Sequence, residues 1–230
     1  MKRLAFAVAF SVCAGSAAFA ADLPVAPPPR APATYVPVSV PYFNWTGIYI
    51  GINGGYDYGV SNWTNPSFPA TGNFNPAGFL IGGTVGGNYQ MGSFVVGVEG
   101  DGDWTNLNAT TSNFCGVGCE TKSDWLATVR GRAGYAWDRV LFYGTGGVAF
   151  ANVQASAGVL PFSSSTQVGW TAGAGIEYAF SPNWTAKVEY LFVDLGNATC
   201  PVGSCSLRGN STTVSLDENV IRGGINFKFW

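Results

Sequence analysis

The chain has 230 residues, of which 47% are hydrophobic, 15% are aromatic and 32 are Gly. Its formal net charge is −2, so nothing in its charge supports nucleic-acid binding. It contains no His, which argues against Ser-His hydrolysis and most proton relays, and we expect no enzymatic activity, no cofactor and no metal site.

Residues 1–20 predict a secretory signal peptide. A basic start, Met1-Lys2-Arg3, precedes an apolar run over residues 4–12, and Ala18-Phe19-Ala20 supplies a small-residue cleavage site. The apolar run is short for a spanning helix, which needs about 20 residues. Cleavage after Ala20 removes two of the 11 Lys and Arg and leaves all 13 Asp and Glu, so the mature net charge is −4.

Residues 21–42 predict a proline-rich periplasmic linker. Proline at this density disfavours both a helix and a central strand, which leaves an extended, polyproline-like segment. The plain interpretation is a disordered tether. The alternative is an arm that contacts the cell wall or partly plugs the following domain.

Beyond residue 42, period-two alternation of apolar and polar residues predicts β-strands. The clearest case is the hairpin over 166–195. There Val168, Trp170 and Ile176 share one face, whereas Thr171 and Glu177 share the other. The predicted strands cover about 45–58, 77–91, 94–104, 123–137, 140–153, 166–180, 184–195 and 213–230.

The connections between these strands alternate in length. Short turns at 92–93, 138–139 and 181–183 alternate with long polar loops at 60–76, 105–121, 155–165 and 197–212. This asymmetry is typical of outer-membrane barrels, and aromatic residues at the strand ends suit the two membrane interfaces. We therefore predict an all-β, eight-stranded antiparallel up-and-down transmembrane β-barrel over residues 43–230.

The polar faces of these strands carry charges that would point into the barrel. A narrow lumen requires these charges to pair, since an unpaired buried ion costs several kcal/mol. We favour a salt-bridge network that blocks water, because eight strands leave an interior that side chains can fill. The alternative is a narrow pore whose charges select ions. The predicted inward charges are Glu99, Asp101, Asp103, Asp124, Arg130, Arg132, Glu177, Lys187, Glu189, Glu218, Arg222 and Lys228.

Four mature cysteines form two close pairs in the long loops. They are Cys115 with Cys119, and Cys200 with Cys205. In an exported protein such pairs predict two small disulfides that stiffen the loops. Bridges between the two loops remain an alternative, and a metal site is disfavoured because neither spacing is a CxxC.

Three motifs carry a family resemblance. Residues 175–190, GIEYAFSPNWTAKVEY, look like a hairpin of the outer-membrane protein A barrel. The start at 44–51, NWTGIYIG, and the end at 221–229, IRGGINFKF, resemble the small outer-membrane immunogenic-protein or porin family of alphaproteobacteria. The resemblance implies surface antigenicity, envelope tethering and a C-terminal aromatic signal for the assembly machinery, with Phe227, Phe229 and Trp230 as candidates.

Taken together, the sequence predicts a structural protein of the outer membrane of a Gram-negative bacterium, which supports the envelope and exposes surface loops. Its expected partners are outer-membrane lipid and lipopolysaccharide, the assembly machinery and, through the N-terminal arm, peptidoglycan. A small-solute porin with a narrow charged lumen is the alternative. A soluble secreted β-sandwich is a third hypothesis, and it requires the aromatic faces to be buried between sheets.

Overall fold

The structure is a computed structural model that describes residues 43–64, 72–112, 118–157, 163–200 and 212–229. The chain divides into two units, residues 1–40 and 41–230, and all described residues belong to the second. The predicted signal peptide at 1–20 and the predicted linker at 21–42 lie outside the described residues and stay predictions.

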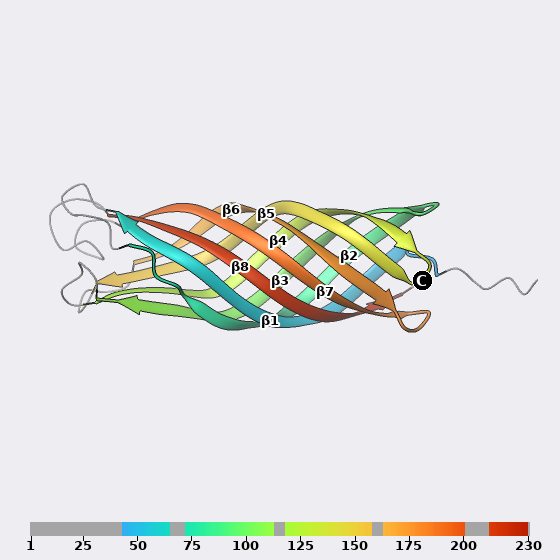
Figure 1. The fold of residues 1–230 in the computed structure, drawn as a ribbon, viewed down its shortest axis with the longest axis horizontal. Coiled ribbons are helices and arrows are strands. Elements are labelled where there is room, and N and C mark those ends of the chain that lie inside the picture. The colour runs from blue at the N-terminus through green and yellow to red at the C-terminus, as the bar shows by residue number, and fades with distance from the viewer. Residues whose placement is uncertain (1–42, 65–71, 113–117, 158–162, 201–211, 230) are drawn as a thin grey trace, which may run out of the picture. The chain divides into compact units, whose positions relative to one another are not determined.

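Eight antiparallel strands follow one another around a closed barrel, and β1 completes it by pairing with β8 (Figure 1). Closure leaves no strand edge unpaired, which a spanning sheet requires. The predicted fold class is confirmed. Among the described residues no helix is long and apolar enough to cross a membrane. The strands are β1 (Gly47–Thr64), β2 (Ala77–Met91), β3 (Phe94–Thr111), β4 (Cys119–Trp137), β5 (Val140–Ala157), β6 (Ser163–Ala179), β7 (Trp184–Cys200) and β8 (Thr212–Lys228).

The tight turns lie together at one end of the barrel, here called the turn end (Figure 1). The other four connections start from the opposite end, the loop end. Gly92 and Asp138 have φ angles of 62° and 53°, the left-handed conformation that two-residue hairpin turns favour. The turns at 92–93 and 138–139 are as predicted, and the third covers 180–183, one residue more than predicted.

The strands run further toward the loop end than the sequence pattern predicts. β1 continues to Thr64, β3 to Thr111 and β5 to Ala157, so the predicted loops at 60–76, 105–121, 155–165 and 197–212 are too long. The extensions are rich in Ser, Thr and Asn, which the pattern assigns to loops. Their backbones nevertheless pair, as Thr64 does with Thr213, because ladder hydrogen bonds do not depend on side-chain polarity.

Register shifts interrupt three strand pairs toward the loop end, between Trp104 and Leu107, Ser123 and Leu126, and Asp194 and Asn197. An extra residue in one strand reverses which side chains face inward beyond it. In β4, both Ser123 and Leu126 therefore face the lumen, and Asp124 is exposed on the outer surface.

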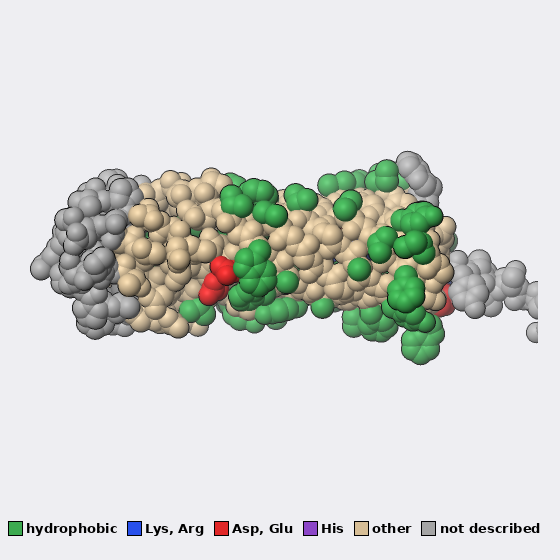
Figure 2. All heavy atoms as spheres, turned by 90° about the horizontal axis from the view of Figure 1, so that it is seen from above, with side chains coloured by type: hydrophobic (Ala, Val, Ile, Leu, Met, Phe, Trp, Pro, Cys, Tyr) green, Lys and Arg blue, Asp and Glu red, His purple; other side chains and the backbone are tan. Residues whose placement is uncertain are grey.

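The outer surface carries an apolar belt. Ile48, Ile50 and Ile52 of β1 are 48%, 48% and 70% exposed, and comparable side chains ring the other strands. Figure 2 shows hydrophobic side chains gathered near the turn end and around the middle, with few beyond them toward the loop end. A spanning strand needs about 9–11 residues, whereas these strands have 15 to 19. The strands therefore project past the belt on the loop side.

Buried apolar side chains form three clusters inside the barrel. The turn-end cluster comprises Phe43, Trp45, Val95, Ala136, Leu141, Tyr143 and Ala179. The leucine layer comprises Leu80, Leu107, Leu126, Ala149, Ala151, Val153, Leu191, Val193, Leu195, Leu216 and Val220. The loop-end cluster comprises Trp63, Cys119, Ala155 and Val214, with Phe74 and Ala198 packed against it. These clusters lie above and below a charged centre.

Candidate functional site

The middle of the lumen holds an ion-pair network. Its nine charged side chains are each at most 7% exposed, and they project from β3, β4, β6, β7 and β8. Glycines on neighbouring strands leave room for them, as at Gly82 of β2, where a Cβ would lie 2.0 Å from Asp103 Oδ1. The network consists of Glu99, Asp101, Asp103, Arg130, Arg132, Glu177, Lys187, Glu189 and Arg222.

Arg130 of β4 is the centre of the network. Its Nη2 lies 2.5 Å from Glu99 Oε1 and 2.6 Å from Asp101 Oδ2 on the neighbouring β3. Its Nη1 reaches across the lumen to Glu189 Oε1 of β7 at 2.9 Å. Thr128 fixes the guanidinium further by accepting a 3.0 Å hydrogen bond from Nε. One side chain therefore joins two opposite walls of the barrel.

Arg132 and Lys187 extend the network toward the turn end. Arg132 Nη2 lies 2.7 Å from Glu177 Oε2, and its guanidinium carbon lies 4.0 Å from the centre of the Tyr143 ring. Lys187 Nζ lies 2.9 Å from Glu99 Oε1. Glu177 also accepts hydrogen bonds from Thr185 and Asn226, among other donors. These carboxylates are therefore held by several donors each, as buried charges require.

Arg222 of β8 closes the network on the loop side. Its Nη1 lies 2.8 Å from Asp103 Oδ2 of β3, and its Nη2 lies 2.7 Å from Glu189 Oε2 and 3.0 Å from Asp101 Oδ2. Three carboxylates from two walls thus share one guanidinium. The charged side chains at this level therefore bind one another across the lumen.

The structure places the predicted inward charges as follows. Nine of the twelve belong to the network, and three do not. Asp124 is exposed because of the register shift in β4, and it accepts a hydrogen bond from Gln154, so its predicted inward position is wrong. Lys228 does not join the predicted network, because its Nζ donates to the Asn44 carbonyl and lies 4.5 Å from the Phe43 ring centre at the barrel rim. Glu218 is buried but makes no ion pair that the described residues show.

The apolar clusters close the lumen on both sides of the network. At the turn end Trp45 is 2% exposed, packs edge-on against Phe43 at 4.8 Å and donates from Nε1 to the Asp138 carbonyl at 3.3 Å. Toward the loop end, Leu191 follows Glu189 by one inward position and Leu126 precedes Thr128 by one. Two apolar barriers therefore flank the charges.

The sequence pattern did not predict the leucine layer, because it assigned the interior to a network of paired charges. The sequence does carry a signal for this layer, which is whether a strand position holds leucine or isoleucine. Every described leucine from 80 onward is at most 3% exposed, whereas every described isoleucine is at least 44% exposed. Leucines at inward positions of strands therefore mark the filled part of this lumen.

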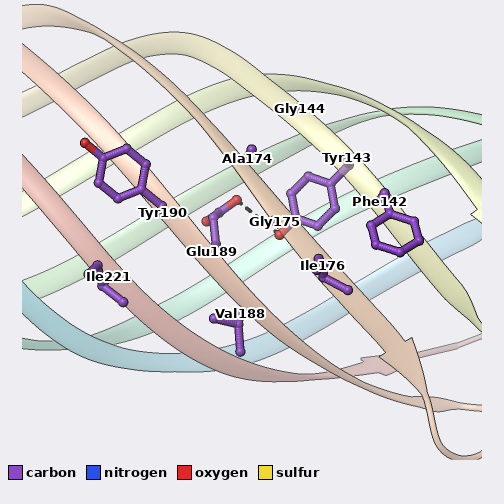
Figure 3. Close-up of a pocket in the computed structure, with 10 residues that line it drawn as sticks. All are labelled: Phe142, Tyr143, Gly144, Ala174, Gly175, Ile176, Val188, Glu189, Tyr190 and Ile221. Carbon is purple, nitrogen blue, oxygen red and sulfur yellow. Dashed lines mark hydrogen bonds between the residues drawn. The ribbon is translucent and has the colours of Figure 1, made fainter.

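A shallow recess of about 630 Å³ lies on the outer wall of β5, β6, β7 and β8 (Figure 3). Phe142, Ile176 and Tyr190 stand around it, and its floor is thin because Gly144 and Gly175 have no side chains. Behind that floor, Tyr143 donates to Glu189 at 3.2 Å inside the barrel. The exposed aromatic and aliphatic side chains around the recess belong to the lipid-facing belt.

Two further predicted groups lie partly outside the described residues. Cys119 is disulfide-bonded and buried, but Cys115, Cys205 and the side chain of Cys200 are outside the described part, so the predicted pairing stays a prediction.

Phe227 packs against Trp184 and Phe229 at ring distances of 5.1 and 5.3 Å on the lipid-facing surface. Trp230 lies outside the described residues. Within the described ranges no group of three His, Cys, Asp or Glu could hold a metal ion.

A closed eight-stranded barrel with an apolar outer belt and a charged, occluded lumen defines a small outer-membrane barrel. The profile of the family described as "Outer membrane protein beta-barrel domain" matches residues 5–229. The chain belongs to this family and is an outer-membrane protein of the alphaproteobacterial type that the motifs predict.

Curated relatives extend over most of the chain. The "31 kDa outer-membrane immunogenic protein" of Brucella melitensis is 37% identical over 93% of this chain and 94% of its own length. The "25 kDa outer-membrane immunogenic protein" of Brucella abortus is 33% identical over 100% and 99%. The "22 kDa outer membrane protein" of Rhizobium leguminosarum bv. viciae is 33% identical over 82% and 80%.

Solved barrels are more distant. The Neisserial surface protein A is 16% identical, with a TM-score of 0.43, over 80% of this chain and 98% of its own. OprG from Pseudomonas aeruginosa is 13% identical, with a TM-score of 0.46, over 80% and 98%.

Proposed function

We propose that the protein is a structural component of the outer membrane, a solid-cored barrel that supports the envelope and holds four chain segments at the cell surface. The observation that carries this proposal is the closure of the lumen at successive levels. The turn-end cluster, the ion-pair network and the leucine layer each fill the cross-section with buried side chains. A barrel packed in this way acts as a stiff support rather than as a conduit.

The porin alternative requires a continuous polar path. In the described part of the barrel, an ion that entered the charged centre would have to pass Trp45 on one side and the leucine layer on the other. Three members of these barriers, Trp45, Leu126 and Leu191, are 2%, 1% and 0% exposed. Desolvating an ion against such apolar walls is strongly unfavourable. No observation therefore favours transport over support.

Planar-bilayer conductance tests the choice between support and transport. We expect the purified wild-type protein to show no stable conductance steps under conditions in which a known porin, reconstituted in parallel, conducts. Stable conductance steps that the folded wild-type protein gives, and that a sample of unfolded protein does not give, would overturn the proposal. Substituting Trp45 and Leu126 together by Ala weakens both apolar barriers at once, and recording from this variant should show how far the barriers contribute to the seal.

A genetic test addresses envelope support directly. Deleting the gene should raise the sensitivity of the cells to detergents and large antibiotics. Expression of the wild-type chain should restore resistance, and so should a chain whose β1–β2 connection carries an epitope tag. Antibody binding to that tag on intact cells tests surface exposure. Full resistance in the deletion strain, with the barrel absent from its membranes, would contradict a supporting role.

Three contacts of this barrel belong to the same proposal. Its apolar belt lies against lipid and, on the loop side, lipopolysaccharide. The aromatic C-terminus, with Phe227 and Phe229 facing outward, is proposed as the signal for the assembly machinery, and F229A should lower the amount of folded barrel in the membrane. The N-terminal arm is proposed to contact peptidoglycan, and mass spectrometry of digested sacculi tests for a covalent adduct.

A further inference from the structure

Two buried carboxyl groups remain outside the ion-pair network. Asp57 of β1 and Glu218 of β8 are both 0% exposed, and all four of their carboxylate oxygens are without a hydrogen-bond partner. Leaving one ionised buried carboxylate without a partner costs several kcal/mol. An arrangement with two such groups therefore calls for a ligand that supplies positive charge or hydrogen bonds.

The strand register brings the two groups together. Asp57 is opposite Val220 and Gly59 is opposite Glu218, so Asp57 and Glu218 are diagonal neighbours on the inner face of the β1–β8 pair. On β1 the inward residue after Gly59 is Ser61, which is the other diagonal neighbour of Glu218. Its hydroxyl is also 0% exposed and without a partner. Three unpartnered polar groups thus follow one another along one seam of the lumen.

The surroundings of this acid pair are apolar. On β8, Glu218 lies between the inward side chains of Leu216 and Val220, which belong to the leucine layer. β2 presents Leu80 at this end of the lumen, and β7 presents Leu191 and Val193. None of these side chains can screen or bind a carboxylate.

The charged groups that face the pair do not neutralise it. Asp103 of β3, the strand next but one to β1, is a charged neighbour of Asp57, and it has the same sign. Arg222 lies two inward positions from Glu218 toward the turn end, but its guanidinium is bound to Asp101, Asp103 and Glu189. Arg130, Lys187 and Glu189 belong to the network below. The nearest cation is therefore already shared by three carboxylates.

A charge count over the buried groups leads to the same point. Among the described residues, Asp57 and Glu218 bring the five acids of the network to seven buried carboxyl groups. The buried cations number only four, namely Arg130, Arg132, Lys187 and Arg222. Full ionisation would leave a net charge of −3 inside the barrel. Paired carboxyl groups in such a site share a proton instead of ionising together.

We propose that Asp57 and Glu218 form a proton-binding site that takes up protons from water when the barrel folds. The bound proton makes the loop-side half of the barrel more stable in acid than in alkaline medium. A proton bound to either carboxyl group neutralises it and thereby removes the repulsion between the two like charges. Raising the pH removes the proton and places two like charges inside the leucine layer. The site gives the support function a built-in dependence on pH.

The sign of the effect follows from linkage. A carboxyl group that binds its proton more tightly in the folded than in the unfolded chain stabilises the fold below the ordinary range of carboxyl titration, and the fold loses that stability as the pH rises. The neutral isosteres D57N and E218Q remove the ionisable groups and keep their shapes. They should abolish this loss.

The experiment compares urea unfolding of the wild-type protein and of D57N/E218Q in phospholipid vesicles from pH 5 to pH 9. We expect the wild-type midpoint to fall by roughly 0.5 M urea or more across this range. The midpoint of the double variant should change less, so the difference between the two midpoints should shift in favour of the variant as the pH rises. The control is E120Q, which removes a carboxylate from a half-buried ion pair with Lys122 on the outer surface. Parallel pH curves for the wild type and D57N/E218Q would overturn the proposal.

Infrared spectroscopy keeps the test valid if the double variant fails to fold. A protonated carboxyl group has a C=O stretching band that a carboxylate lacks, and this band should be present in the wild-type protein at pH 7 and lost or reduced in D57N and in E218Q. Repeating the unfolding with calcium and with a chelator tests the competing ligand. A calcium-dependent rise in the wild-type midpoint that is absent from D57N/E218Q would show that the site binds a metal cation, and it would overturn the proposal that its ligand is a proton.

Discussion

Arg130 of β4 and Glu189 of β7 meet at 2.9 Å between Nη1 and Oε1, although β5 and β6 separate their strands in the barrel. Such a contact can form only across the lumen. It ties opposite walls together at the level where the inward glycines would otherwise leave the barrel hollow. Cross-lumen pairing is therefore a mechanical feature of this barrel as well as an electrostatic one.

R130A should destabilise the barrel and leave conductance unchanged. The substitution leaves the buried carboxylates of Glu99, Asp101 and Glu189 with one cation fewer. Breaking a buried ion pair in this way costs about 3–5 kcal/mol. The leucine layer and the turn-end cluster remain, so no path opens. Urea unfolding in vesicles measures the first effect and planar-bilayer recording measures the second. R139A, in the exposed turn at 138–139, is the control and should behave as the wild type. A conducting R130A would show that the network alone seals the lumen.

L126A should destabilise the barrel through a cavity in the leucine layer. Leu126 is 1% exposed and lies in a cluster that it shares with Leu107 and Leu191. Replacing a buried leucine by alanine costs about 2–5 kcal/mol, depending on how far the site can collapse. The matched control is V129A, three residues along β4 on the lipid-facing side, where Val129 is 63% exposed. Equal losses in the two variants would argue that the lumen at this level is not packed.

The architecture could be predicted from the sequence because period-two alternation and turn chemistry are local. Gly92-Ser93 and Asp138-Arg139 specify hairpin turns by themselves, and the alternation in the hairpin over 166–195 specifies both faces. Eight strands and their closure follow from these signals. The strand ends beyond the apolar belt do not, because Ser- and Thr-rich pairs there carry no apolar alternation.

The site was predictable in composition but not in geometry. Inward alternation places Glu99 and Arg130 in the lumen correctly. It fails at Asp124 because a register shift is a property of two paired strands and has no signature in one. It fails at Lys228 because the side chain lies at the rim, where a long amphipathic residue reaches a backbone carbonyl instead of the network. Cross-lumen partners such as Arg222 and Asp103 depend on closure and cannot be read from neighbouring strands.

G82A should disrupt the network, whereas G102A should not. A Cβ at Gly82 would lie 2.0 Å from Asp103 Oδ1 and 2.3 Å from the Gly102 carbonyl oxygen, and the backbone atom cannot move aside without distorting β3. A Cβ at Gly102 would meet nothing within 4 Å. Both glycines lie in the same strand pair, so backbone entropy affects the two variants alike. Heat-modifiable gel migration and urea unfolding should show a loss for G82A only. Equal tolerance of both substitutions would mean that the lumen has spare room at Asp103.

D194N should lower the pKa of Asp217. These two residues face each other across β7 and β8, on the outer surface just past the last belt residues, Phe192 and Ile221. Partial burial and the Asp194 carboxylate raise the pKa of Asp217 above its ordinary value. The variant removes the second cause and keeps an oxygen that can accept the 3.1 Å hydrogen bond from Trp170 Nε1.

The raised pKa fixes the sign of the pH dependence at this surface pair. The folded chain holds the Asp217 proton more tightly than the unfolded chain does, so the contribution to stability is present in acid and is lost as the pH rises through the folded-state pKa. NMR titration of labelled aspartate carboxyl carbons measures the midpoint directly. It should move down in D194N and in high salt, because screening weakens the repulsion between exposed charges. D124N, which removes a carboxylate elsewhere on the outer surface, should leave the Asp217 midpoint where it is in the wild type, and an equal shift in both variants would show that the raised pKa comes from the overall surface charge and not from Asp194.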